Sequence, residues 1–167
     1  MADQHLVFLA LGTNLGDRQS NLTQALQLLT ERVNVTAISS LYETAPAYVT
    51  EQPAFLNLAV KGHTDLSPTE LLTYLKELEA RIGREKSVRY GPRKIDLDIL
   101  FYDDWVINDP PRLHIPHPRM IERGFVLHPL ADIAPNFLHP ILKQTIHELL
   151  AQLPPDDGIL KVTDWEP

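Results

Sequence analysis

The chain has 167 residues, of which 44% are apolar and 22% charged, a composition typical of a folded domain. Its formal net charge of −7 disfavours nonspecific binding to nucleic acid or to an anionic membrane, because the long-range field repels both. The absence of cysteine excludes disulfides and thiolate chemistry, and no apolar run approaches membrane-spanning length. We therefore expect a single domain, residues 1–167, in the cytoplasm, with neither nucleic acid nor a membrane as partner.

The first part of the chain has the patterns of a strand, a helix and a second strand. Residues 6–11 form a continuous apolar run that ends at Gly12, typical of a strand buried on both faces. A turn leads into a helix with apolar residues at helical spacing as far as Val33, and residues 35–42 are rich in Val, Ile and Thr, as strands are. The glycines of the turn lack the spacing of a phosphate-binding loop, which favours an ordinary strand-to-helix connection.

A long loop, a strand and a helix are predicted next. Residues 43–53 contain two prolines and no helical period, so we expect a loop that covers or binds a ligand. Residues 55–60 follow as a strand, with two leucines and a valine on the core face and Asn57 on the opposite face. Residues 67–70 then combine an N-cap serine, a first-turn proline and a capping-box glutamate, so a helix is predicted from there to Gly83.

Residues 95–102 are predicted as a strand, and residues 95–99 alternate apolar and acidic side chains with the period of a strand. Asp96 and Asp98 therefore project from one face, with Cα atoms about 6.6 Å apart. A turn at Gly91-Pro92 that carries three basic side chains directly precedes them. Carboxylates beside cations suit a metal-bound polyphosphate, since the acids hold Mg²⁺ and the cations take the remaining phosphate charge. The alternative is an edge strand whose aspartates only face water, and the spacing alone leaves both interpretations open.

The predicted order up to Tyr102 is strand, helix, strand, strand, helix, strand. This order defines an α+β fold with a ferredoxin-like βαββαβ core, in which two helices cover one face of an antiparallel sheet and the carboxylates point to the other. The remaining third is predicted as a proline-rich C-terminal extension, with strand 95–102 turning into residues 105–107 and a short helix around 145–153. Residues 125–127 favour a core position over a stacking surface.

A zinc site is disfavoured by the positions of the seven histidines. His114 and His117 lie close together, but no third nitrogen or sulfur ligand stands at a zinc-motif spacing.

Four blocks of the sequence occur together in one known family. They are residues 10–16 (Ala-Leu-Gly-Thr-Asn-Leu-Gly), 42–44 with 52–57, 91–100 (Gly-Pro-Arg-Lys-Ile-Asp-Leu-Asp-Ile-Leu), and 115–118 with 123–127. With these blocks the chain resembles the 6-hydroxymethyl-7,8-dihydropterin pyrophosphokinases of folate biosynthesis, and the third block is highly specific. The resemblance implies the ferredoxin-like fold and the transfer of pyrophosphate from ATP to the hydroxymethyl group of the pterin, with release of AMP.

The resemblance also implies a role for each site residue. Asp96 and Asp98 would bind two Mg²⁺ ions, with ATP phosphates completing the coordination, and a metal would acidify the attacking hydroxyl. The implied catalytic residues are Arg84, Arg93, Asp96 and Asp98. The implied ATP-binding residues are Glu79, Arg84, Lys86, Arg93, His117 and Arg123. The implied pterin-binding residues are Thr44, Ala45, Ala47, Phe55, Asn57, Tyr90 and Phe125, with two rings sandwiching the heterocycle and Asn57 bonded to its amide edge.

The chain departs from the family pattern at a few of these positions. Ala45, Phe55 and Tyr90 stand where known members carry Pro, Tyr and Trp, and the loop between Arg84 and Arg93 is one residue shorter. We expect ring stacking to survive these changes, whereas closure of the loop over the substrates depends on its length.

Two other functions remain to be weighed against the pyrophosphokinase. One is a catalytically inactive ferredoxin-like module that binds a nucleotide or a partner protein, and it would need only half of the site. The other is a metal phosphohydrolase, which would need more metal ligands than this strand supplies. The sequence does not determine the oligomeric state, for which we keep a monomer as the expectation.

Overall fold

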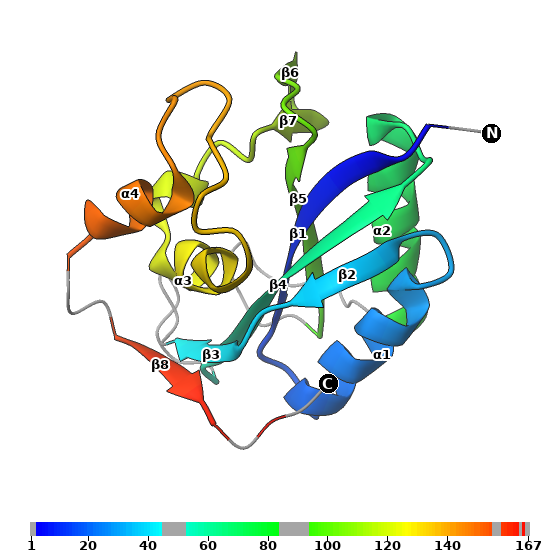
Figure 1. Ribbon diagram of the computed structural model, residues 1–167. Coiled ribbons are helices and arrows are strands. Elements are labelled where there is room, and N and C mark those ends of the chain that lie inside the picture. Colours follow the sequence, from blue (N-terminus) through cyan, green and yellow to red (C-terminus); the bar gives the residue numbers. More distant parts are fainter. Residues whose placement is uncertain (1–2, 45–52, 84–93, 155–157, 164, 166–167) are drawn as a thin grey trace.

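The computed structural model describes the chain except for residues 1–2, 45–52, 84–93, 155–157, 164 and 166–167 (Figure 1). In chain order the elements are β1 (His5–Thr13), α1 (Arg18–Leu29), β2 (Asn34–Ile38), β3 (Leu41–Thr44), β4 (Phe55–Thr64), α2 (Pro68–Ile82), β5 (Asp96–Tyr102), β6 (Ile107–Asp109), β7 (Leu113–Ile115), the 3₁₀ helix η1 (Met120–Glu122), α3 (Gly124–Ile133), α4 (Ile146–Ala151) and β8 (Ile159–Val162).

The main sheet has the strand order β5-β1-β4-β3-β8, and β2 also pairs with β4. Every pairing is antiparallel. Helices α1 and α2 cover one face of this sheet (Figure 1). The arrangement confirms the α+β class and the ferredoxin-like core, with β2 and β3 together in the place of one predicted strand.

The predicted strand 35–42 is broken at Ser39. The Ser39 hydroxyl accepts a hydrogen bond of 2.8 Å from the Ala59 backbone N–H, and the Ser39 N–H donates to the Ala59 carbonyl at 2.9 Å. A side-chain oxygen thus replaces a carbonyl in the ladder and interrupts the regular pairing with β4.

Helix α2 begins and ends at the residues that the sequence predicts. Ser67 is its N-cap, and the Ser67 and Glu70 side chains form both hydrogen bonds of a capping box. Gly83 closes the helix in the left-handed conformation, with φ at 102°. The observed caps at Ser67 and Gly83 confirm the predicted ends of the helix.

The second face of the sheet carries a core of its own. Phe8, Ala59 and Leu100 point to this side and pack with buried residues of α3 and α4, including Leu127 and Leu149. In Figure 1 the two helices lie on the opposite side of the sheet from α1 and α2. The face to which the carboxylates were predicted to point is therefore covered over part of its area.

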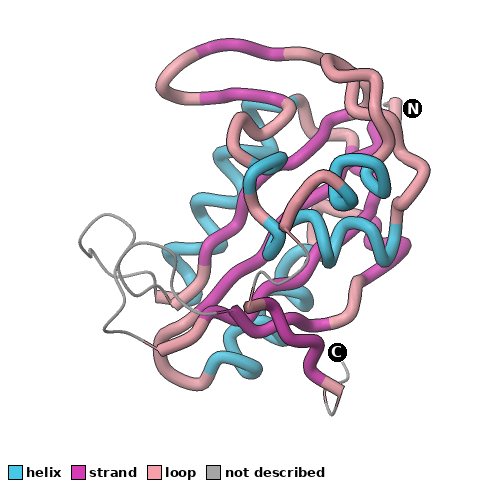
Figure 2. Tube along the Cα trace, turned by 90° about the vertical axis from the view of Figure 1, so that its left-hand side faces the viewer, coloured by secondary structure: helices cyan, strands magenta, loops and turns pink. Residues whose placement is uncertain are grey.

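The C-terminal third is more regular than the sequence indicates. The predicted short helix is confirmed as α4, but neither α3 nor β8 was predicted. Helix α3 continues through Pro129, although proline normally disrupts a helix. The helix is stabilised because Val126, Leu127 and Leu130 bury its apolar side in the second core. Residues 105–107 do not extend β5; β6 starts at Ile107 and pairs with β7 in a separate two-stranded sheet, at the top of Figures 1 and 2.

Candidate active site

Three neighbouring strands bring Asn57, Gly12 and Asp96 into one row. Gly12 of β1 pairs with Asn57 of β4 on one side and with Asp96 of β5 on the other. Directly opposite residues of antiparallel strands share a face, so the three positions face the same way, about 5 Å apart from strand to strand. The next row of that face places Asp98 beside Ala10. A polar strip therefore crosses the sheet on the side away from α1 and α2.

Two buried nitrogen atoms on this side have no hydrogen-bond partner within the described part of the chain. They are Nδ2 of Asn57 and Nε of Arg123. A buried N–H group without a partner costs about 1–3 kcal/mol, so these two groups are candidate donors to a bound ligand. Gly12 makes room for the first of them, since a Cβ atom at Gly12 would lie 2.8 Å from Oδ1 of Asn57.

The two carboxylates differ in their surroundings. Burial, followed by the nearby charge of Asp96, raises the pKa of Asp98 to about 7, and Glu79 adds to the effect while Lys76 and Arg123 oppose it. The negative charge on this part of β5 is therefore only partly neutralised by the neighbouring side chains. A bound cation would relieve the repulsion between the two aspartates.

Glu79 of α2 supports the strand that carries the aspartates. Its side chain is 3% exposed, and Oε2 accepts a hydrogen bond of 2.8 Å from the backbone N–H of Leu97, the residue between Asp96 and Asp98. Its other oxygen lies 3.2 Å from Nζ of Lys76. Since β5 is an edge strand of the sheet, the carboxylate caps a backbone donor that no neighbouring strand can take.

His117 and Arg123 follow β5 in the sequence and lie near the aspartates, since the charge of Asp96 acts on His117 and that of Arg123 acts on Asp98. The backbone N–H of His117 donates to the Leu100 carbonyl at 3.1 Å. Its Nδ1 accepts from the Arg119 N–H at 3.3 Å, which assigns the proton of the neutral ring to Nε2. Burial, and then the charge of Arg123, lower the pKa of His117 to about 4, while Asp96 opposes the shift. His117 is thus a neutral donor near pH 7.

The described residues of the predicted pterin pocket come from three elements. Thr44 ends β3 and pairs with Phe55 at the start of β4, on the same face as Asn57. Phe125 lies in the first turn of α3, which packs over this face, and its ring centroid is 5.5 Å from the guanidinium carbon of Arg123. Phe125 is half-buried at the margin of the second core, whereas Val126 and Leu127 are buried within it.

Six predicted site residues lie outside the described residues. They are Ala45, Ala47, Arg84, Lys86, Tyr90 and Arg93. The structure does describe the ends of both segments: Thr44 pairs with Phe55, two residues before Asn57, and the Lys94 carbonyl accepts from Thr13, next to Gly12. The predicted roles of the six residues stay predictions.

The turn after β1 has a positioning role that the sequence interpretation missed. Nδ2 of Asn14 donates to the Pro53 carbonyl at 3.0 Å, and Nη1 of Arg18 donates to the Ala54 carbonyl at 2.8 Å. Thr13 donates to the Lys94 carbonyl at 2.6 Å. The turn thus holds the start of β4 and the approach to β5 together. The signal available in the sequence was the polar pair Thr13 and Asn14, which follows the apolar run of residues 6–11.

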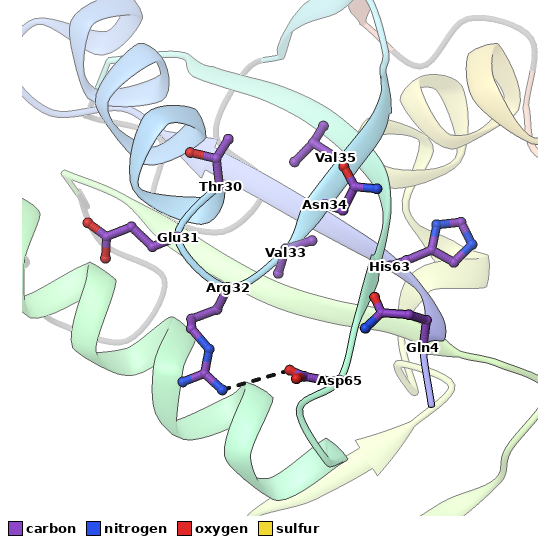
Figure 3. A pocket seen from close by; sticks show the side chains of 9 residues that line it. All are labelled: Gln4, Thr30, Glu31, Arg32, Val33, Asn34, Val35, His63 and Asp65. Atoms are coloured by element: carbon purple, nitrogen blue, oxygen red, sulfur yellow. Dashed lines mark ion pairs between the residues drawn. The ribbon is translucent and has the colours of Figure 1, made fainter. Parts of the chain in front are cut away.

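A polar cleft of about 420 Å³ lies at the other end of the sheet (Figure 3). It is lined by residues before β1, between α1 and β2, and at the end of β4, and the Arg32–Asp65 ion pair of 3.8 Å crosses it. None of the predicted site residues that the structure describes lines this cleft. It is therefore separate from the polar strip.

The described residues do not form a metal cage of their own. No group of three or more His, Cys, Asp or Glu side chains converges within them. A cation at Asp96 and Asp98 would consequently take further ligands from a bound substrate, and phosphate oxygens are suited to this. Among the described helices, none is long and apolar enough to cross a membrane.

The fold and this side of the sheet define a class of protein: a small α+β enzyme with paired carboxylates and basic donors for a phosphate-bearing substrate. Residues 8–135 match the family described as 7,8-dihydro-6-hydroxymethylpterin-pyrophosphokinase (HPPK). The chain belongs to this family.

Individual relatives support the assignment. The chain is 40% identical over 158 residues to the 2-amino-4-hydroxy-6-hydroxymethyldihydropteridine pyrophosphokinase of Aquifex aeolicus, covering 93% of this chain and 98% of that protein. It is 44% identical over 153 residues to the folic acid synthesis protein FOL1 of Dictyostelium discoideum, covering 92% of this chain but 23% of that protein. The chain thus spans about a quarter of that longer relative.

The structural comparison agrees at the level of the fold. A crystal structure of Plasmodium falciparum HPPK-DHPS matches with a TM-score of 0.73 at 21% identity, over 90% of this chain and 44% of that chain. The ferredoxin-like architecture predicted from the sequence is therefore that of the family.

Proposed function

We propose that this chain transfers the pyrophosphoryl group of ATP to the hydroxymethyl group of 6-hydroxymethyl-7,8-dihydropterin, giving the pterin diphosphate and AMP. Membership of the family supports the reaction. The location of the reaction is supported by the row of Asn57, Gly12 and Asp96, beside two buried nitrogens that have no partner in the described part of the chain. This row puts a heterocycle-binding amide about 10 Å from the carboxylates, so one face holds both substrates.

The β5 end of the row is proposed to bind the nucleotide phosphates. Asp96 and Asp98 fit Mg²⁺, since they offer adjacent hard oxygen donors whose mutual repulsion a cation relieves. Magnesium held there, as two ions in our proposal, supplies charge neutralisation of the transferring group. His117 donates from Nε2 and Arg123 from its guanidinium to phosphate oxygens. Arg84, Lys86 and Arg93 are proposed to add further phosphate contacts.

The β4 end is proposed to bind the pterin. Asn57 donates from Nδ2 to the amide edge of the ring, and Phe55 and Phe125 stack on its faces. Thr44 borders the same pocket, to which Ala45, Ala47 and Tyr90 are assigned by the family resemblance. Glu79 was predicted to contact ATP, but its hydrogen bond to Leu97 supports the interpretation that it holds β5 in place.

A product assay tests the proposal. The purified chain is incubated with Mg²⁺, ATP and the hydroxymethyl dihydropterin, and nucleotides and pterins are separated by chromatography. AMP and pterin diphosphate should form in equal amounts, and a chelator should stop both. Formation of ADP would mean single-phosphoryl transfer or hydrolysis and would contradict the proposal.

Replacing Gly12 with alanine should impair pterin use. The new methyl group would press on Oδ1 of Asn57 and displace its amide, so we expect kcat/KM for the pterin to fall by about tenfold or more. Gly62→Ala is the matched control, because its Cβ would meet the Asn34 carbonyl at 2.8 Å, near the other end of β4. The control should lose stability but keep its pterin KM. Equal pterin kinetics in Gly12→Ala and wild type would remove Gly12 from the site.

The metal-free protein should lose stability as the pH rises toward 8. The pKa of Asp98 is about 7 in the fold against 3.8 for an unperturbed aspartate, so the contribution of its protonated form is complete below about pH 4 and is lost as the pH rises through about 7. Between about pH 5.5 and 8 this amounts to about 2 kcal/mol. Denaturant unfolding with a chelator measures it. The Asp98→Asn variant should lack this component, and the same pH dependence in both proteins would contradict the assignment.

Two expectations stay predictions in this proposal. One is a monomeric state and the other is the cytoplasmic location. A relative from Arabidopsis thaliana is named as a mitochondrial folate synthesis bifunctional protein, so membership of the family does not by itself imply the cytoplasm.

A further inference from the structure

Asp132, an exposed residue of α3, accepts three hydrogen bonds from β3 and the residue just before it. The hydroxyl of Tyr42 donates to Oδ1 of Asp132 at 3.0 Å and to Oδ2 at 2.9 Å. The backbone N–H of Ser40 donates to the same Oδ2 at 3.2 Å. Asp132 lies next to the last residue of α3, and the two donors come from β3 and from the residue just before it. One carboxylate thus joins elements 90 residues apart in the sequence.

The environment of Tyr42 makes this contact directional. Its side chain is 8% exposed, and burial, followed by the hydrogen bond to Asp132, raises its pKa above the ordinary value of tyrosine. The ring of His128, one helical turn before Asp132, lies at 33° to the Tyr42 ring with centroids 5.9 Å apart. Tyr42 therefore contacts α3 at two successive turns, through the His128 ring and through the Asp132 carboxylate.

The two elements joined in this way carry different walls of the proposed pterin pocket. Tyr42 pairs with Asn57 across the strands, and β3 ends at Thr44 beside Phe55. Helix α3 carries Phe125 in its first turn, about two turns from Asp132. A rotation or slide of α3 against β3 would therefore move the Phe125 ring relative to Asn57.

Apolar packing alone does not fix that placement. Val126, Leu127 and Leu130 hold α3 on the sheet, but burial of apolar surface is non-directional and tolerates small rotations. Hydrogen bonds to both oxygens of one carboxylate are directional and specify one rotation of the helix. Stacking and amide recognition of a flat ring also tolerate less displacement than the long side chain of Arg123, which can adjust to a phosphate.

We propose that Tyr42 and Asp132 are positioning residues that orient α3 and thereby set the spacing between Phe125 and Asn57 for the pterin. This inference rests on the proposed function, because it assigns the pocket between these residues to the pterin. It predicts an effect on pterin affinity that exceeds any effect on ATP affinity.

The test measures pterin and ATP dissociation constants separately, with a non-hydrolysable ATP analogue present for the pterin. Tyr42→Phe and Asp132→Ala should each raise the pterin Kd about three- to tenfold, the loss expected for one directional hydrogen-bonded contact. The double variant should bind the pterin no more weakly than Asp132→Ala alone, since Asp132→Ala already removes the hydrogen bonds from the Tyr42 hydroxyl. The Kd of the ATP analogue should change by less than about twofold.

Tyr74→Phe is the matched control. Tyr74 is also 8% exposed, and its hydroxyl donates to the Leu28 carbonyl on the opposite face of the sheet. Its replacement should lower stability about as much as Tyr42→Phe while leaving the pterin Kd unchanged. Because Asp132 is exposed, Asp132→Ala keeps the test available if Tyr42→Phe folds poorly.

Two results would overturn the inference in distinguishable ways. If Tyr42→Phe and Asp132→Ala lose stability but bind the pterin as wild type does, the contact is only structural. If the wild-type chain itself does not bind the pterin, the proposed function fails, and the inference fails with it.

Discussion

Replacing Asp98 with asparagine should reduce the rate of AMP formation by about 10³-fold or more. The substitution keeps the size of the side chain but removes one of the two adjacent charges that would hold Mg²⁺ and ATP phosphates on β5. Asp96→Asn should have an effect of the same order, because both carboxylates are proposed to hold the magnesium ions. Single-turnover measurements at saturating ATP and pterin would quantify the loss.

The same charge change elsewhere on the surface provides the control. Asp104 is exposed and lies just after β5, so Asp104→Asn alters the net charge without touching the polar strip. It should leave turnover unchanged, and pterin binding should persist in Asp98→Asn. Near-normal turnover of Asp98→Asn would exclude the proposed metal role of β5.

Replacing Asn57 with alanine should raise the pterin KM and lower kcat/KM by about 10²-fold. Its Nδ2 is buried and has no partner among the described residues, so a pterin oxygen would be the acceptor that satisfies it. A site built to hydrogen-bond its substrate discriminates strongly when the bond is lost. Asn57→Asp keeps the shape but replaces the donor with a carboxylate, and it should be impaired at least as much.

Asn21 is the control residue, because it is as buried as Asn57 but its side-chain amide is hydrogen-bonded within the protein. It is 5% exposed against 7% for Asn57, but its Nδ2 donates within the protein, to the Leu15 carbonyl at 2.8 Å and to Thr13 Oγ1 at 3.3 Å. Asn21→Ala should therefore lower the free energy of unfolding by about 1–3 kcal/mol while keeping pterin affinity within about twofold. If the two variants behaved alike in both measurements, Asn57 would be a structural residue and not a pterin ligand.

The sequence predicted those parts of the site that follow from local periodicity. The period of a strand places Asp96 and Asp98 on one face, and Asn57 opposite the leucines of β4, and the structure has both arrangements. The capping residues of α2 likewise predicted where that helix begins and ends.

Long-range features could not be predicted in the same way. The row of Asn57, Gly12 and Asp96 depends on the register of three strands, which is set by pairing between distant segments. Helix α3 is short and contains Pro129, so its existence depends on packing against the sheet and not on propensity. The contact between Tyr42 and Asp132 depends on that packing and leaves no signal in either segment.

The fate of the β-phosphorus of ATP tests the central claim most directly. ATP labelled at the β-phosphate is incubated with Mg²⁺, the hydroxymethyl dihydropterin and the chain, and the products are separated. The proposed reaction moves the label onto the pterin and leaves AMP unlabelled, with label and γ-phosphate appearing on the pterin in equal amounts. If the label remains in ADP while only the γ-phosphate moves, or if both substrates bind without any transfer, this chain is not a pyrophosphokinase.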